Sequence, residues 1–310
     1  MSTSPGSDLT WRVETADEHA EVPAALPARL RDAVTAAPGL DCVGFFDQDD
    51  FVYGLNRLSG AGRWEALLRL GVHLAVAWRG LDRDLQPLRT GRLIRTVLDA
   101  EAGAVFCETV RPGRHVIGTV ASATSAADRE RADAALTTVV DHLRTADRLP
   151  TQNPGAFTDE GPGIPPTAER VLHTTGPSDL LAPLLPGIRL DGLHAIAYYT
   201  RGTQLATADC FDSPHLAQFH HQATPTHRRA LYTTLGHDLA ALATHLNQAT
   251  AEALGGPLHR IVLDVQQGAI YYRRLPRQHY LVGITLDQTQ VRQADHQMHA
   301  LAHHLSTTPA

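Results

Sequence analysis

The sequence predicts an α+β protein made of two copies of one α-β-β-α-β-β-β-α unit, each a five-stranded antiparallel sheet packed with helices. Three observations support this fold class. The 310 residues are 43% hydrophobic and 19% charged, a composition typical of packed domains, and the length suits two of them. Hydrophobic spacing alternates between helical and strand periods in the same order in both halves of the chain. The two halves are also similar in sequence.

The similarity between the halves is a direct internal repeat. An offset of 165 residues aligns residues 67–120 with residues 232–285 without a gap. In the densest part, GRLIRTVLDAEAGAV (91–105) and GPLHRIVLDVQQGAI (256–270) share eight of fifteen residues. Similarity at a fixed offset indicates copies of one structural unit. Because exposed sheet edges pair readily, we expect the two copies to form an intramolecular pseudo-dimer.

The first copy begins with a short helix pattern at 26–37, which Pro38-Gly39 ends. Two apolar, aromatic runs at 42–46 and 51–55 flank an acidic turn, as in a hairpin. Apolar residues then recur every three or four positions over 63–81, which predicts an amphipathic helix. The remaining predicted elements are strands at 93–98, 104–110 and 115–121 and a closing helix at 128–143.

The second copy is predicted to repeat this order. Its elements are a helix at 179–185, strands at 192–199 and 203–207, a long helix at 226–254, strands at 258–265, 269–275 and 280–286, and a helix at 291–305. It differs from the first copy by an insertion at 208–226, where the first copy has only the loop 56–62. This asymmetry suggests that the copies have different roles.

A proline-rich stretch separates the copies. Residues 149–170 hold five prolines and several glycines, which predicts an extended linker. We therefore expect four segments along the chain. They are a flexible N-terminal segment at 1–24, a first domain at 25–148, the linker at 149–170 and a second domain at 171–306.

Composition excludes several classes of function. All 27 basic residues are arginine, so the chain has no P-loop lysine, no Schiff-base lysine and no Ser–Lys dyad. With a formal charge of −6, no broad basic surface is expected for nucleic acid. No apolar run approaches the ~20 residues of a membrane span, and the polar N-terminus lacks the build of a signal peptide. Three widely spaced cysteines do not suggest a disulfide framework, so we expect a cytoplasmic protein.

The insertion holds the best metal-ligand types in the chain. Cys210, Asp212, His215, His220 and His221 cluster there, but their spacing matches no structural zinc signature. A loop that covers the sheet is the simpler interpretation, and a metal-dependent enzyme that uses residues 209–227 is the weaker alternative. We expect no resident metal and no cofactor.

No nucleophile stands out either. Cys42 and Cys107 lie in predicted strands, where buried thiols are more common than reactive ones. No Gly-x-Ser-x-Gly elbow and no Gly-rich phosphate loop follows a predicted strand. The sequence therefore predicts that the protein is not an enzyme.

Two glycines coincide under the repeat offset within the long predicted helices, Gly71 and Gly236. Glycine costs about 1 kcal/mol relative to alanine inside a helix, so we expect close backbone approach there, to the sheet or to the other long helix. The candidate interaction surface on these helices comprises Trp64, Gly71, Trp78, Gly236, His237 and His245. Asp99 and Asp264 also coincide, each just before a glycine-containing turn, and we expect them to cap these turns.

This element order, with the final meander and amphipathic helix, resembles the roadblock/LC7 family. Residues 96–143 and 261–305 and the two preceding hairpins carry the resemblance, which spans most of 25–145 and 178–305. GAF, profilin-like and longin-like domains share parts of the same architecture. The resemblance rests on pattern and element order, because the family has no invariant catalytic motif.

The resemblance implies a function. Roadblock-like proteins dimerise and act as platforms or regulators for Ras-like small GTPases. The leading hypothesis is therefore a non-enzymatic regulatory or scaffold protein with a protein partner, neither bound to nucleic acid nor inserted in a membrane, in which further homo-oligomers are possible. The alternative is a GAF-like small-molecule sensor with a pocket between the sheet and the insertion at 208–226.

Overall fold

The computed structural model describes residues 11–16, 22–48, 50–57, 61–121, 125–152 and 169–307. Most of the expected linker and much of the expected N-terminal segment lie outside the described residues. The chain forms two compact units. The first comprises the residues up to Val76 and those from Ala102 to Pro150; the second comprises Ala77–Glu101 and the residues from Thr151 onward.

The sheet of the first unit is antiparallel throughout, in the order β1-β3-β2-β6-β5. Its strands are β1 (Arg12–Thr15), β2 (Leu40–Asp47), β3 (Asp50–Asn56), β5 (Gly103–Arg111) and β6 (Arg114–Ala121). Most side chains of β2 and β5 are buried, because helices cover both faces of this sheet. Such strands read as continuous apolar runs rather than as an alternating pattern.

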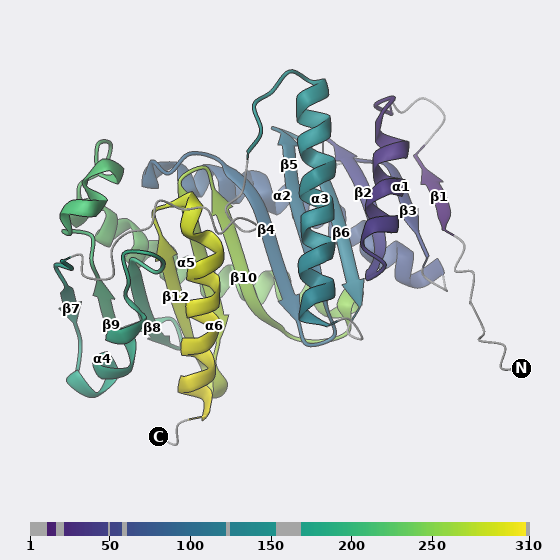
Figure 1. Cartoon of the computed structure of the whole chain (residues 1–310). Coiled ribbons are helices and arrows are strands. Elements are labelled where there is room, and N and C mark those ends of the chain that lie inside the picture. Colours follow the sequence, from purple (N-terminus) through teal and green to yellow (C-terminus); the bar gives the residue numbers. More distant parts are fainter. Residues whose placement is uncertain are drawn as a thin grey trace, which may run out of the picture. The chain divides into compact units, whose positions relative to one another are not determined.

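Two helices, α1 (Leu26–Ala36) and α3 (Ala126–Ala146), lie together on the near face of this sheet in Figure 1. The helix α2 (Ala61–Leu85), whose residues up to Val76 belong to this unit, lies on the far face. Ser125 and Asp128 form a capping box at the start of α3, each side chain accepting a hydrogen bond from the backbone N–H of the other. This cap satisfies two of the free N–H groups at a helix start.

The sheet of the second unit has the order β4-β10-β11-β12-β8-β9-β7 and is also antiparallel. Its strands are β4 (Leu93–Ala100), β7 (His173–Thr175), β8 (Ala195–Thr200), β9 (Thr203–Asp209), β10 (Leu258–Val265), β11 (Gly268–Arg274) and β12 (His279–Thr285). The pairing of β4 with β10 explains why residues 77–101 pack in this unit.

The helices of the second unit also cover both faces of its sheet. α4 (Ser178–Leu184) and α6 (Val291–Thr307) lie on the near face in Figure 1, and α5 (Pro225–Leu254) lies on the far face. The Thr224 side chain accepts a hydrogen bond at the start of α5, and Pro225 takes the first helical position. Gly255 ends the helix with φ of 75°, a left-handed conformation that suits glycine. The short 3₁₀ turns are η1 (Gln86–Leu88), η2 (Leu185–Gly187), η3 (Pro214–Phe219), η4 (Pro276–Gln278) and η5 (Gln288–Gln290).

The predicted α+β class with antiparallel sheets is confirmed. Within the described residues, the first unit has five strands and the second has seven, whereas the sequence predicts five in each copy. β4, predicted as a strand of the first copy, packs in the second unit, and the sequence does not predict β1 and β7. β1 falls within the segment expected to be flexible, and β7 comes just after the linker. Both are short, largely exposed edge strands that pair on one side, with β3 and β9. Such strands need little apolar periodicity, so the sequence pattern misses them.

None of the helices within the described ranges is both long enough and apolar enough to cross a membrane.

Candidate functional site

The two repeated glycines bring the long helices close to the sheets. A Cβ on Gly71 would overlap the ring of Phe46 on β2, and a Cβ on Gly236 would overlap the ring of Tyr199 on β8. The expected close approach is therefore made to the sheet, in each case by an aromatic ring near the end of a strand. The Tyr280 hydroxyl also donates to the Gly236 carbonyl, at 3.2 Å.

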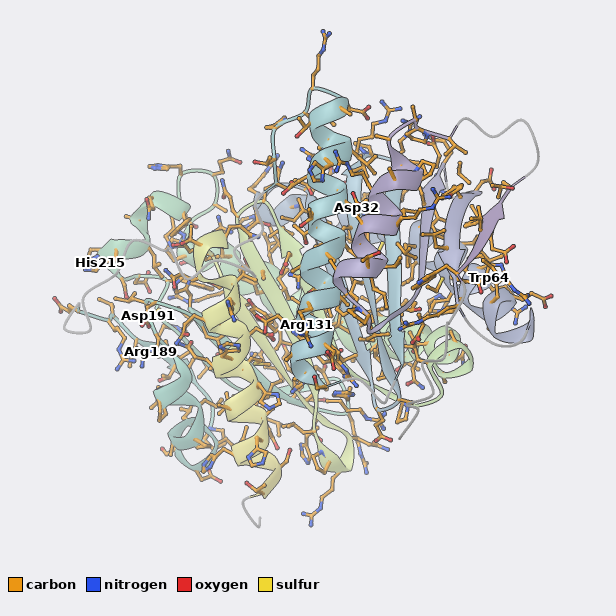
Figure 2. The ribbon with its side chains drawn as sticks, turned by 45° about the vertical axis from the view of Figure 1, so that its right-hand side comes forward. Asp32, Trp64, Arg131, Arg189, Asp191 and His215 are labelled. Atoms are coloured by element: carbon orange, nitrogen blue, oxygen red, sulfur yellow. The ribbon has the colours of Figure 1, made fainter. Side chains whose placement is uncertain are left out.

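The remaining residues of the candidate interaction surface lie in different environments. Trp78 is only 4% exposed and belongs to the core. Trp64 is half-buried and meets Phe51 edge-on, with ring centroids 5.6 Å apart (Figure 2). His237 and His245 are exposed on α5. Of the six candidates, these two histidines alone are exposed, while Gly71 and Gly236 face the sheets.

An apolar groove lies along α5 beside the end of α2 and η1, with a volume of about 190 Å³. It is lined by Leu81, Asp84, Pro87, Leu88, Leu231, Thr234, Leu235, Asp238, Leu239 and Leu242, and we call it the leucine groove. Leu81, Leu231 and Leu242 remain partly exposed in it. Asp84 and Asp238 are exposed, so the groove combines apolar walls with an acidic rim.

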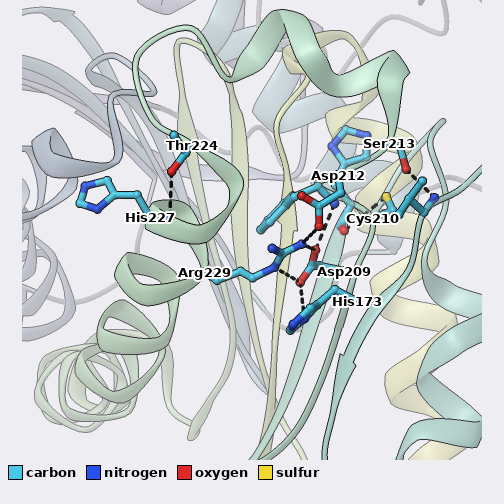
Figure 3. Close-up of polar contacts among 11 residues, drawn as sticks. His173, Asp209, Cys210, Asp212, Ser213, Thr224, His227 and Arg229 are labelled. Carbon is cyan, nitrogen blue, oxygen red and sulfur yellow. Dashed lines mark hydrogen bonds and ion pairs between the residues drawn. The ribbon is translucent and has the colours of Figure 1, made fainter.

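A polar cluster lies where the insertion leaves β9 (Figure 3). Arg229 on α5 donates from Nε and Nη2 to the two carboxylate oxygens of Asp209, at 2.8 and 2.7 Å, and also to Asp212. His173 on β7 lies 3.5 Å from the same Asp209 carboxylate. The hydrogen bond to Asp209 is the main reason that the pKa of Arg229 is raised. The cluster fixes the insertion to α5 and to the edge strand.

The five metal-ligand candidates of the insertion do not converge on one point. Cys210 is buried, and its Sγ lies 3.5 Å from the His194 carbonyl. Asp212 bonds Arg229, and His220 packs against Phe211, with ring centroids 6.2 Å apart. His215, on η3 (Figure 2), and His221 are exposed. In the part of the chain that the structure describes, no three His, Cys, Asp or Glu residues are placed to hold a metal ion.

A buried arginine, Arg228, holds the insertion in place. Its side chain is 1% exposed. Nη1 donates to the Leu88 carbonyl in η1 at 3.0 Å, and Nη2 donates to the Phe219 carbonyl at the end of η3 at 2.6 Å. Sequence reasoning missed this residue, because the spacing that predicts α5 follows its leucines. The signal available was an arginine in the first turn of a helix, at a position that faces inward.

The repeated arginines and aspartates pair across the β4–β10 ladder. Val97 lies opposite Val262, its own equivalent under the repeat offset. Arg95 forms an ion pair with Asp264, and Arg260 forms one with Asp99. Residues related by the offset therefore exchange partners, as in an isologous interface.

Asp99 and Asp264 thus have a role other than the expected turn capping. Asp264 is fully buried, and the side chain of Asp99 is 12% exposed. Burial alone would lower the pKa of Arg260, but the carboxylates of Asp295 and Asp99 raise it overall. The sequence prediction considered Asp99 and Asp264 alone. In both copies, however, an arginine precedes the aspartate by four residues.

The cysteine thiols are buried, as expected for Cys42 and Cys107, which are 5% and 1% exposed. Burial raises the pKa of both thiols. Burial, followed by the nearby Asp209 carboxylate, raises the pKa of Cys210 to about 12. Thiols held protonated in this way are poor nucleophiles and poor metal ligands.

The chain is similar to several solved structures, whereas no family model and no curated protein matches it. A roadblock/LC7 domain from Streptomyces avermitilis is 15% identical, with a TM-score of 0.31, over 39% of this chain and 96% of that one. MglC from Myxococcus xanthus is 15% identical, with a TM-score of 0.30, over 39% and 98% of the two chains. A structure titled "MglB with tetrameric arrangement" is 14% identical, with a TM-score of 0.31, over 40% and 96%. Over about two fifths of its length, this chain is thus similar to a roadblock/LC7 domain, MglC and MglB.

Proposed function

We propose that this protein is a non-enzymatic regulatory scaffold of the cytoplasm that binds a protein partner through the leucine groove. The observation that carries this proposal is the groove itself, which partly exposed leucines and two exposed carboxylates line together. Such a groove suits an apolar side chain of a partner, flanked by basic residues. The resemblance of the sequence to the roadblock/LC7 family supports a Ras-like small GTPase as that partner.

The chain is further proposed to be a tandem duplication whose halves, residues 25–148 and 171–306, associate as an internal pseudo-dimer. The internal repeat and the exchange of ion-pair partners between Arg95, Asp99, Arg260 and Asp264 support this proposal. In such an arrangement one chain presents the surface that a homodimer would otherwise assemble from two.

The test is affinity capture from the native host lysate, run in parallel with GDP and with a non-hydrolysable GTP analogue. We expect the wild-type protein to retain a small GTPase in one nucleotide state. Charge reversal at the groove, Asp84→Arg with Asp238→Arg, should weaken binding of that purified GTPase by about tenfold or more. The matched control is Asp32→Arg with Asp179→Arg, which changes the net charge equally at exposed positions outside the groove.

Two results would contradict the proposal. One is that no small GTPase is retained in either nucleotide state. The other is that the groove variant and the control variant bind the GTPase equally well, which would place the interface elsewhere on the protein.

A further inference from the structure

A second concave site lies on the other side of α5 from the leucine groove, between this helix and the sheet of the second unit. Its volume is about 140 Å³, and we call it the α5 hollow. Ala195 and Ala197 of β8 line its base, together with Val282 and Ile284 of β12. Because two of these four side chains stop at Cβ, they leave space beneath the helix that larger residues would fill.

Three aromatic side chains form part of the wall of the α5 hollow. Phe211 and Tyr232 line it and are buried, with ring centroids 5.9 Å apart. Tyr199 lines it as well, and its hydroxyl donates to the Gln204 side chain at 3.0 Å. A cavity of roughly 150 Å³ with apolar walls takes up a benzene ring. The volume of the hollow and the aromatic part of its wall therefore suit one six-membered ring.

The charged groups at the α5 hollow are paired with one another. Arg229 and Asp209 line it and bond one another, and Arg229 also bonds Asp212. His173 lines it too and lies 3.5 Å from the Asp209 carboxylate. The guanidinium and both carboxylates are therefore already engaged with one another. An ionic ligand would lose hydration without gaining a free counter-charge.

Two hydroxyl groups that line the α5 hollow are available to a ligand. Thr207 on β9 and Thr233 on α5 both line it, and neither side chain has a hydrogen-bond partner within the described part of the chain. A threonine hydroxyl both donates and accepts a hydrogen bond. It therefore suits a ligand that carries a hydroxyl group of its own.

From this geometry we infer that the α5 hollow is a binding site for a small uncharged aromatic molecule with one hydroxyl group, of about the size of phenol. The ring lies against the alanines of β8 and beside the Phe211–Tyr232 pair. The ligand hydroxyl is bonded by Thr207 and Thr233. This site is separate from the leucine groove and does not depend on the function proposed for it.

Methyl-detected NMR of the full-length protein tests this inference. Phenol should cause saturable shifts of the methyl signals of Ala195, Ala197 and Ile284. Toluene, which replaces the hydroxyl by a methyl group, should bind about threefold to tenfold more weakly, as expected for one lost hydrogen bond. Benzoate and benzylamine carry charges and should bind more weakly than phenol.

Two neighbouring substitutions on α5 supply the variant and its control. Thr233→Leu places a larger side chain in the α5 hollow and should weaken phenol binding by about tenfold or more. Thr234 is exposed and lines the leucine groove instead, so Thr234→Leu should leave phenol binding unchanged. Ala197→Val fills the hollow from the sheet and gives a second blocking variant with a small change in volume.

The inference is overturned if phenol causes no saturable shifts, if both Thr233→Leu and Ala197→Val bind phenol as the wild type does, or if benzoate or benzylamine binds as tightly as phenol. These outcomes leave the capture of a small GTPase untouched. Equally, loss of that capture in the groove variant leaves phenol binding untouched, so the two proposals fail separately.

Discussion

At the scale of single residues, His194 shows how burial sets the charge of a side chain. It is 0% exposed, its Nε2 donates to the Leu190 carbonyl at 3.1 Å, and its Nδ1 accepts from the Leu286 N–H at 2.9 Å. The ring is therefore neutral, because protonated Nδ1 has no lone pair to accept that bond. Burial is the main cause that lowers the pKa of His194 from 6.5 to about 4.

We expect His194 to make stability depend on pH. Because the folded state disfavours the protonated ring, the unfolded state binds the proton first as the pH falls below 6.5. The stabilisation is thus fully present above pH 6.5 and is lost progressively down to about pH 4. The loss should reach about 3 kcal/mol. Urea unfolding at several pH values measures it.

The control for this prediction is His194→Gln, which removes the titrating group. This variant should be less stable at pH 7, but its stability should change less between pH 6.5 and pH 4 than that of the wild type. Equal pH dependence in the two proteins would show that other groups cause it.

A second residue-scale lesson concerns what sequence can predict of the site. The glycine contacts followed from one physical fact, the cost of glycine inside a helix, together with the coincidence of Gly71 and Gly236 in the repeat. Arg228 and the α5 hollow did not follow in this way. The sequence shows which residues are present. It does not show which carbonyls the fold brings to Arg228 or which rings it brings to the hollow.

At the scale of elements, the long helices allow a comparison between two glycines. Gly80 on α2 has open space where a Cβ would lie, whereas Gly236 on α5 lies against Tyr199. Gly80→Ala should stabilise the protein by about 0.5–1 kcal/mol, because alanine is the better helix former. Gly236→Ala should destabilise it by about 1–3 kcal/mol, because the added methyl group forces the ring aside. Thermal unfolding compares the two variants directly.

The ring contact supplies the check on this prediction. Combining Gly236→Ala with Tyr199→Leu should cost less than the sum of the two single changes, because the smaller side chain gives the new methyl group room. If the destabilisations caused by Gly236→Ala and Tyr199→Leu are additive, the glycine is required for a reason other than its contact with the Tyr199 ring.

The β4–β10 ladder supports a prediction about buried charge. Asp264→Ala removes the carboxylate that pairs with the buried Arg95. We therefore expect a loss of about 3–5 kcal/mol in the free energy of unfolding. The double variant Arg95→Met with Asp264→Leu should lose much less, because apolar residues can replace a buried ion pair. Urea unfolding measures the free energy of unfolding of both variants. A double variant as unstable as Asp264→Ala would contradict this account.

Elements were easier to predict than the pairings between them. Apolar spacing placed the helices and the central strands to within a few residues, because both depend on periodic burial. Apolar spacing did not predict the edge strands β1 and β7, since backbone hydrogen bonds to one neighbouring strand are enough to form them. The ion pairs between β4 and β10 were not predicted either, because two strands that are far apart in the sequence leave no local pattern of their pairing.

At the scale of the whole molecule, the offset symmetry of the ladder predicts how part of the chain behaves alone. A fragment that begins at Thr151 lacks β4, so one edge of β10 is unpaired. Two such fragments can pair through β10 with Val262 opposite Val262 and with Arg260 opposite Asp264 of the other copy, as the register of Val97, Arg95 and Asp264 in the intact chain implies. We expect this fragment to sediment as a dimer.

Charge changes test the register of that dimer. Arg260→Asp in the fragment places two carboxylates opposite each other and should prevent dimer formation. Adding Asp264→Arg restores opposite charges at both contacts and should restore the dimer. A wild-type fragment that remains monomeric at tens of micromolar would show that β10 needs β4 in particular.

The side chain of Arg228 has a consequence for communication within the second unit. One of its hydrogen bonds ends on Leu88, which lines the leucine groove, and the other ends on Phe219 of the insertion that begins beside the α5 hollow. A shift of the first turn of α5 would therefore displace both Leu88 in the wall of the leucine groove and the end of η3 in the insertion. One arginine side chain thereby ties a wall of the leucine groove to the end of η3.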